Sequence, residues 1–202
     1  MTNLVFLGAV SVGKTSGLRI FVKALEENRV EELTGIKCSL VKTDFSGESV
    51  LKPGESKETK TIHPNRVIWR DETHQTSHTI FTPGGDHERA VVKMGIITIS
   101  RIVRQVVAVF DLTRPLEVQF EFFKEVRFFP KSVAVALNKF DLVDESKRDG
   151  LMKEYEEKIT EFFKERKISI TGFYPTCAEP NPKFQEYNDN IVKMVVEACT
   201  KE

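Results

Sequence analysis

Short apolar runs alternate with longer amphipathic stretches along most of the chain. We expect strands at residues 4–7, 66–70, 77–81, 106–111, 132–137 and 168–173. Apolar residues recur at helical spacing in residues 14–27, 88–104, 117–127, 146–166 and 184–200, which we expect to be helices. The runs 106–111 and 132–137 are apolar almost throughout, as is typical of strands buried on both faces. The alternation predicts an α/β fold with a mostly parallel central sheet of about six strands and helices on both faces.

Residues 28–60 interrupt this alternation. The part with the letters KPGESKE, residues 52–58, is polar and rich in turn-forming residues, and residues 36–45 have the character of an extra strand. A connection of this length usually carries function. Because the chain has 202 residues, we expect one domain over residues 1–202, with residues 28–60 as an extended segment inside it.

Composition narrows the class of protein. Acidic and basic residues balance at 30 each and are interspersed, so we expect no nucleic-acid partner. Cys38, Cys177 and Cys199 are too far apart for a metal knuckle, and an odd number argues against a disulfide framework. The sequence lacks a signal peptide, an apolar run of membrane-spanning length and the usual lipidation motifs. We therefore expect a cytoplasmic protein without a membrane anchor.

A phosphate-binding loop is predicted at residues 8–15. Their letters, GAVSVGKT, fit the Walker A pattern G-x-x-x-x-G-K-[ST] at every fixed position, between a predicted strand and a predicted helix. The N–H groups of such a loop point at phosphates, its lysine neutralises the β- and γ-phosphate oxygens, and its hydroxyl binds Mg²⁺. The predicted nucleotide contacts are Gly8, Ser11, Val12, Gly13, Lys14, Thr15 and Ser16, with Lys14 also catalytic and Thr15 a magnesium ligand.

A base-reading loop is predicted at residues 138–141, NKFD, which follow an apolar strand. Asp141 can accept hydrogen bonds from the N1–H and the 2-amino group of guanine together, whereas adenine lacks that pair of donors. Lys139 can lay its aliphatic stem over the base, and Asn138 can tie neighbouring loops together. The order N-K-x-D therefore favours guanine over adenine.

Together with the triplet Thr176, Cys177 and Ala178 near the C-terminus, these motifs resemble those of the Ras-like small GTPase superfamily, which are P-loop GTPases. The similarity spans nearly the whole chain, and its pattern is closest to the MglA-type polarity GTPases of bacteria and archaea. The resemblance implies a G-domain fold, GTP and GDP with Mg²⁺ as ligands, and GTP hydrolysis in a molecular switch. It also implies that Cys177 and Ala178 lie near the guanine O6.

The letters TPGGD, ending at Asp86, occupy the place of this family's D-x-x-G-Q turn. If Gly85 senses the γ-phosphate, Thr82 replaces the magnesium-side Asp and Asp86 replaces the water-orienting Gln. If Gly84 is the sensor, Phe81 replaces the Asp. MglA-type proteins have a Thr at the Asp position, which the first alignment keeps, and a Pro before the Gly, which the second keeps. We prefer the first, because Thr can hold a magnesium-bound water and Phe cannot.

Both alignments remove the glutamine. The negative charge of Asp86 suits developing phosphate charge poorly, so we expect slow intrinsic hydrolysis that needs a partner. His87 is a second candidate for positioning the water. The resemblance also implies that a threonine before the second strand, Thr61 with Thr59 as runner-up, closes on Mg²⁺ and the γ-phosphate.

Cationic side chains at Lys57, Lys60 and Arg66 are further candidates for approaching the phosphates. The MglA resemblance implies a GTPase-activating regulator of the Roadblock type, and effector proteins that read the nucleotide state. Two other interpretations of the function stay open. The protein could be a nucleotide-bound scaffold without significant hydrolysis, or an ATP-using kinase or ATPase.

Overall fold

The structure is a computed structural model that describes residues 1–46, 63–86 and 90–200. Its strands are β1 (Thr2–Leu7), β2 (Cys38–Asp44), β3 (Asn65–Asp71), β4 (Thr76–Thr82), β5 (Gln105–Asp111), β6 (Ser132–Asn138) and β7 (Ser169–Pro175). Its α-helices are α1 (Lys14–Glu26), α2 (Arg29–Thr34), α3 (Ala90–Ile102), α4 (Leu116–Glu125), α5 (Arg148–Glu165) and α6 (Gln185–Thr200). Short 3₁₀ helices lie at Phe140–Leu142, Glu145–Lys147 and Pro182–Phe184.

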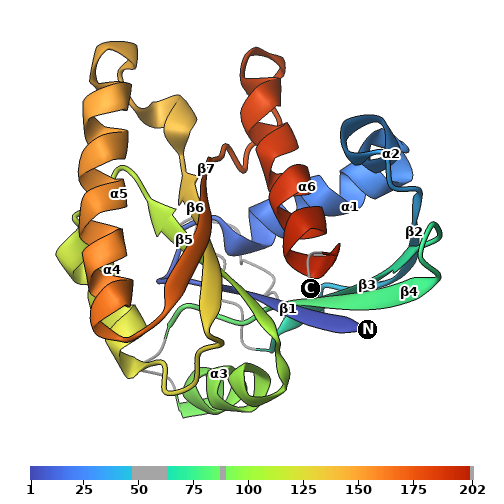
Figure 1. The fold of residues 1–202 in the computed structure, drawn as a ribbon, viewed down its shortest axis with the longest axis horizontal. Helices are drawn as coiled ribbons and strands as arrows, with labels where there is room; N and C mark the ends of the chain where they lie inside the picture. The colour runs from blue at the N-terminus through green and yellow to red at the C-terminus, as the bar shows by residue number, and fades with distance from the viewer. Residues whose placement is uncertain (47–62, 87–89, 201–202) are drawn as a thin grey trace, which may run out of the picture.

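The strands form one sheet in the order β2-β3-β4-β1-β5-β6-β7 (Figure 1). β1 pairs in parallel with β4 and β5, and β5, β6 and β7 continue the parallel part. β3 is antiparallel to both β4 and β2. The predicted α/β fold with a mostly parallel sheet is therefore confirmed.

The sheet has seven strands where the sequence predicted about six. The additional strand is β2, which lies inside residues 36–45 and forms the outer edge of the sheet. Most of its residues are exposed or half-buried. An edge strand of this kind lacks the continuous apolar run that marks a buried strand, so its sequence signal is weaker.

Alternate residues of the central strands supply two separate cores, one on each face of the sheet. In β1, Leu4 and Phe6 pack in the core shared with α1 and α6, whereas Val5 and Leu7 pack in the core shared with α3, α4 and α5. Side chains of a strand point to its two faces in turn, so one apolar run serves both layers. Helices therefore cover both faces of the sheet, as Figure 1 shows.

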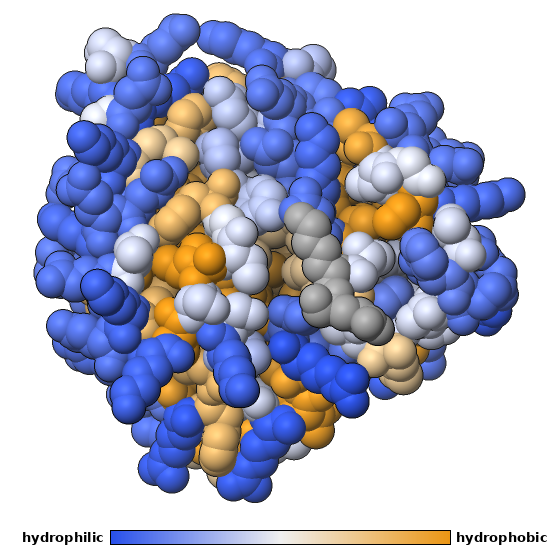
Figure 2. All heavy atoms as spheres, in the orientation of Figure 1, coloured by the Kyte–Doolittle hydropathy of each residue, from blue (hydrophilic) through white to orange (hydrophobic). Residues whose placement is uncertain are grey.

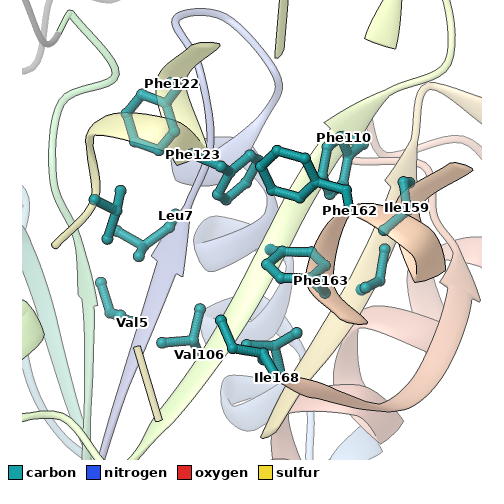
Figure 3. Packing of buried hydrophobic residues seen from close by; sticks show 14 of the residues in the cluster. Val5, Leu7, Val106, Phe110, Phe122, Phe123, Ile159, Phe162, Phe163 and Ile168 are labelled. Atoms are coloured by element: carbon teal, nitrogen blue, oxygen red, sulfur yellow. The ribbon is translucent and has the colours of Figure 1, made fainter. Parts of the chain in front are cut away.

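Aromatic side chains dominate the core beneath α4 and α5 (Figure 3). The rings of Phe110 and Phe123 lie 4.8 Å apart, and both pack edge-on against Phe163. On the face drawn in Figure 2, hydrophilic residues cover most of the outer rim and apolar residues lie between them. Within the described ranges, no helix combines the length and the apolar character needed to cross a bilayer.

The topology gathers several chain segments at one edge of the sheet. The parallel strands β1, β4, β5, β6 and β7 all end there with their carboxyl ends, which is where ligands bind in open α/β sheets. Because β3 runs the other way, it begins at this edge, and Asn65 pairs with Thr82 of β4. The predicted phosphate, switch and base-reading segments therefore meet at the same place.

Candidate functional site

The phosphate loop follows β1 directly and leads into α1. Gly13 has φ = 94°, a left-handed conformation that favours glycine, and a Cβ atom there would lie 2.2 Å from the Asn138 Nδ2. A Cβ atom on Gly8 would lie 2.5 Å from the carbonyl oxygen of Val109 in β5. Close packing therefore requires both fixed glycines of the motif, and Gly13 is required by its positive φ as well.

Lys14, the first residue of α1, is buried. Its ammonium group donates to the carbonyl oxygens of Gly8 (2.8 Å) and Ala9 (2.7 Å). Burial lowers the pKa of Lys14 to about 7, and the nearby charge of Arg114 contributes to that lowering. An anion beside Lys14 would favour the charged form of its amine, because opposite charges attract. The buried ammonium group is therefore suited to binding a phosphate.

Asn138 joins the base-reading loop to the phosphate loop. Its amide nitrogen donates to the carbonyl oxygen of Val12 (2.8 Å), and its amide oxygen accepts from the Thr176 hydroxyl (3.2 Å). The Phe140 N–H donates to the carbonyl oxygen of Thr176 (3.2 Å). Three segments that are far apart in the sequence are thus fastened by one buried side chain.

Asp141 and Cys177 lie next to each other beside this junction. Burial raises the pKa of the Cys177 thiol to about 11, and its hydrogen bond with the Asp141 carboxylate adds to the rise. A Cβ atom on Gly13 would also contact the methyl group of Ala178 at 3.3 Å. Ala178 therefore borders the phosphate loop, and Asp141 lies beside the neighbouring Cys177.

Asp111 at the end of β5 is a hub that the sequence analysis did not single out. Its fully buried carboxylate accepts from the Lys139 ammonium (2.6 Å) and from both the N–H (2.8 Å) and the hydroxyl (2.6 Å) of Thr113. Arg114 adds an ion pair at 3.4 Å. Lys139 itself has φ = 64°. The pair with Asp111 fixes the direction of the lysine stem.

Gly85 is packed against the phosphate loop. A Cβ atom on Gly85 would lie 2.4 Å from both the carbonyl carbon and the oxygen of Ala9, and 2.5 Å from the Val10 nitrogen. Only a glycine can approach that peptide so closely. Asp86 follows at once and is half-buried. This contact supports the alignment in which Gly85 is the sensor, although the choice of register remains a prediction.

Three polar side chains meet on the side of the loop where α1 begins. The Asn65 amide nitrogen donates to the Thr15 hydroxyl at 3.3 Å. Asn65 and Thr82 are both fully buried, and their oxygens, Asn65 Oδ1 and Thr82 Oγ1, have no hydrogen-bond partner among the described residues. Buried polar atoms are normally paired, so these two oxygens and the Thr15 hydroxyl are suited to a hydrated cation.

The positions of the other predicted site residues say less about their roles. Ser11 has φ = 60°, and its buried hydroxyl has no hydrogen-bond partner within the described part of the chain. Ser16 lies in the first turn of α1. Arg66 follows Asn65 in β3, so its side chain points to the opposite face of the sheet. Residues outside the described ranges are Lys57, Thr59, Lys60, Thr61 and His87.

Sequence reasoning missed Asn65, Asp111 and Arg114. None belongs to a local motif, and each acquires its place through tertiary pairing. Asn65 is 50 residues from Thr15, and Arg114 is 104 residues from Val10, the phosphate-loop residue that it contacts. For Asp111, the sequence offered one signal, which is a polar residue at the end of an apolar strand.

No model of a known protein family matches the sequence, and no curated protein matches it. Solved structures do match. A bacterial selenocysteine-specific elongation factor, EF-Sec, superposes with a TM-score of 0.55 at 18% identity, over 98% of this chain and 29% of its own. The elongation factor SelB of Methanococcus maripaludis, solved with the GTP analogue GppNHp, has a TM-score of 0.54 at 15% identity, over 98% and 34%.

The chain thus spans about a third or less of the length of these two factors. Sequence identities this low show similarity of fold alone. The closeness to the MglA type remains a prediction. The chain has the fold of a P-loop GTPase G domain.

Proposed function

We propose that this chain is a guanine-nucleotide switch that binds GTP and GDP with Mg²⁺ and hydrolyses GTP to GDP and phosphate. The observation that carries the proposal is the convergence of the phosphate loop, the NKFD loop and the Thr176–Ala178 segment on Asn138. Two of the solved structures with this fold are elongation factors, and one of them holds a GTP analogue. We take the predicted single domain over residues 1–202 as the working unit.

Guanine is the proposed base because Asp141 lies beside Cys177, and the next residue, Ala178, lies against Gly13 of the phosphate loop. Its carboxylate offers two acceptors to the N1–H and 2-amino donors of guanine. Cys177 and Ala178 are the proposed neighbours of the guanine O6. Lys139, directed by Asp111, supplies its aliphatic stem to one face of the base.

Magnesium is proposed to bind beside Thr15. The buried oxygens of Asn65 and Thr82, which lack a hydrogen-bond partner within the described part of the chain, fit this ion, which keeps several waters and prefers oxygen ligands. Thr15 would be a direct ligand, and Asn65 and Thr82 would accept from magnesium-bound waters. Thr61 is the proposed additional ligand from the first switch. When bound, Mg²⁺ neutralises charge on the β- and γ-phosphate oxygens.

Hydrolysis is proposed to proceed by direct attack of water. The water oxygen forms a bond to the γ-phosphorus, the bond to the β–γ bridging oxygen breaks, and that electron pair leaves on GDP. The proton of the water passes to the released phosphate. Lys14 and the N–H of Gly85 would stabilise the phosphoryl oxygens, whereas Asp86, the residue in the place of the usual Gln, would orient the water poorly. Slow turnover without a partner follows.

The proposal places the protein in the cytoplasm, with a GTPase-activating regulator, of the Roadblock type if the MglA resemblance holds, and with effectors. A second candidate function is a nucleotide-bound scaffold without significant hydrolysis. The argument in its favour is that, in the preferred alignment, Thr82 and Asp86 stand where Ras-like GTPases have Asp and Gln, and that both alignments lack the Gln. The two candidates differ in whether phosphate is released in a single turnover with excess protein.

Base selectivity tests the proposal. Displacement of a fluorescent GDP analogue by GTP, GDP, ATP and ADP should show at least a hundredfold preference for guanine. Asp141→Asn should lose this preference and gain affinity for xanthosine diphosphate, whose C2 carbonyl accepts from the new amide. The matched control is Asp144→Asn, because Asp144 is exposed and forms an ion pair with the exposed Lys147. Equal competition by ATP and GTP would contradict the assignment.

A further inference from the structure

Arg114 lies at the phosphate loop although it belongs to a different part of the chain. It stands in the turn between β5 and α4, and its Nη1 donates to the carbonyl oxygen of Val10 (2.8 Å). Its Nε lies 3.4 Å from the Asp111 carboxylate. The side chain remains 38% exposed, so part of it is open to a ligand arriving from solvent.

The turn that carries Arg114 is held by a set of buried hydrogen bonds. Gln119, 1% exposed, accepts from the Asp111 N–H (2.7 Å) and donates to the carbonyl oxygens of Asp111 (2.9 Å) and Arg114 (3.1 Å). The Tyr155 hydroxyl donates to the same Arg114 carbonyl (2.5 Å). A cation on so constrained a turn is preorganised, and little reorganisation is needed when it meets an anion.

The position of Arg114 along the loop indicates which phosphate it faces. Gly85 packs against the peptide between Ala9 and Val10, and Arg114 binds the carbonyl of Val10. The second-switch glycine and the arginine therefore approach the same stretch of loop. Gly85 is the proposed sensor of the terminal phosphate, so Arg114 lies at the terminal end of the phosphate chain.

A guanidinium has five N–H donors, and the contacts with Val10 and Asp111 use only some of them. Its planar geometry suits phosphate oxygens, and it stays charged at any physiological pH. Arg114 is also near enough to Lys14 for its charge to contribute to the lowered pKa of that lysine. Two cations this close favour a ligand with high negative charge.

We propose that Arg114 is a built-in cation for the terminal phosphate, binding γ-phosphate oxygens of a nucleoside triphosphate beside Lys14. The inference rests on the proposed function and adds a residue to it. It also offers this chain a source of the positive charge that some GTPases receive from a partner. This role of Arg114 does not depend on the candidate cations of the first-switch region, which are Lys57, Lys60 and Arg66.

The competing explanation is that Arg114 only fastens the phosphate loop to β5. The two roles differ in their ligand dependence. A fastening role affects the loop whichever nucleotide is bound, whereas a γ-phosphate contact affects the triphosphate alone. Comparing affinities for GDP and for a non-hydrolysable GTP analogue therefore separates them.

The test uses Arg114→Ala, Arg114→Lys and the control Arg104→Ala. Arg104 is exposed at the opposite end of β5, so it matches the size and charge of the removed side chain away from the site. Displacement of fluorescent GDP at fixed free Mg²⁺ gives the affinities for GDP and GppNHp, and thermal unfolding without nucleotide reports the fold. Arg114→Ala should weaken GppNHp binding about tenfold while changing GDP binding by less than about threefold.

Arg114→Lys should recover part of the loss, because the positive charge remains but the planar set of five N–H donors does not. Arg104→Ala should bind both nucleotides like the wild type. Equal losses for GDP and GppNHp in Arg114→Ala, or no loss for either, would overturn the inference while leaving guanine-nucleotide binding intact. Failure of the wild-type protein to bind any guanine nucleotide would instead overturn the proposed function, and with it this inference.

Discussion

The protonation state of Lys14 gives the most quantitative prediction. Without nucleotide, burial holds its pKa near 7. At pH 8 such a group is only about one tenth protonated, whereas phosphate oxygens beside it restore the charged form. Nucleotide binding at pH 8 should therefore take up about 0.9 proton, and binding at pH 6 about 0.1.

The affinity should follow the same linkage. Above pH 7 each further pH unit should weaken nucleotide binding by nearly tenfold, because a proton must be bound together with the ligand. Lys14→Arg removes this dependence, since arginine stays charged throughout the range. The sign for stability is opposite. The folded, nucleotide-free protein binds fewer protons than the unfolded chain between about pH 7 and 10.5, so Lys14 contributes stability that rises with pH in that window.

Calorimetric titration of GDP in two buffers of different ionisation enthalpy measures the proton uptake directly. Carbon NMR of lysine-labelled protein, with Lys14 assigned by its absence in Lys14→Arg, measures the pKa without any ligand. The reasoning is refuted if Lys14 titrates near the pKa of a free lysine and the affinity is constant between pH 7 and 9.

Three further substitutions test individual contacts. Gly13→Ala should cost more than about 2 kcal/mol in unfolding free energy, because its φ is 94° and its Cβ would lie 2.2 Å from the Asn138 side chain; urea unfolding measures this, and an unchanged midpoint would contradict it. Asn138→Ala removes buried hydrogen bonds at 2.8 and 3.2 Å and should cost roughly 2–3 kcal/mol, which the same assay would disprove if stability stayed within about 0.5 kcal/mol. Asn65→Ala should speed GDP release at micromolar free Mg²⁺ by about tenfold, with Asn65→Asp restoring retention; equal release rates at all Mg²⁺ concentrations would exclude Asn65 from the metal side.

The sequence predicted those parts of the fold whose signal is local. The strands that became β5 and β6 are apolar on both faces, and their positions follow from that pattern to within one residue. The phosphate loop is recognisable because its glycines and lysine are needed within eight consecutive residues. The edge strand β2 carries a mixed pattern, so it was only suggested inside residues 36–45.

The remaining site residues depend on topology. Asn65 reaches Thr15 only because β3 runs antiparallel to β4 and therefore starts at the carboxyl edge of the parallel strands. Arg114 reaches Val10 only because β5 lies beside β1. Neither pairing can be read from neighbouring letters, so a single sequence gives no reason to choose these residues over other polar ones.

We propose above all that this chain holds a guanine nucleotide between Lys14 and Asp141. The most direct measurement is the identity of the nucleotide that copurifies with the protein, released by heat and separated by chromatography, for the wild type and for Asp141→Ala. We predict GDP or GTP in near-stoichiometric amount from the wild type and little from the variant. Adenine nucleotide from both proteins would contradict the account, as would a wild-type protein that neither carries guanine nucleotide nor binds it when it is added with Mg²⁺.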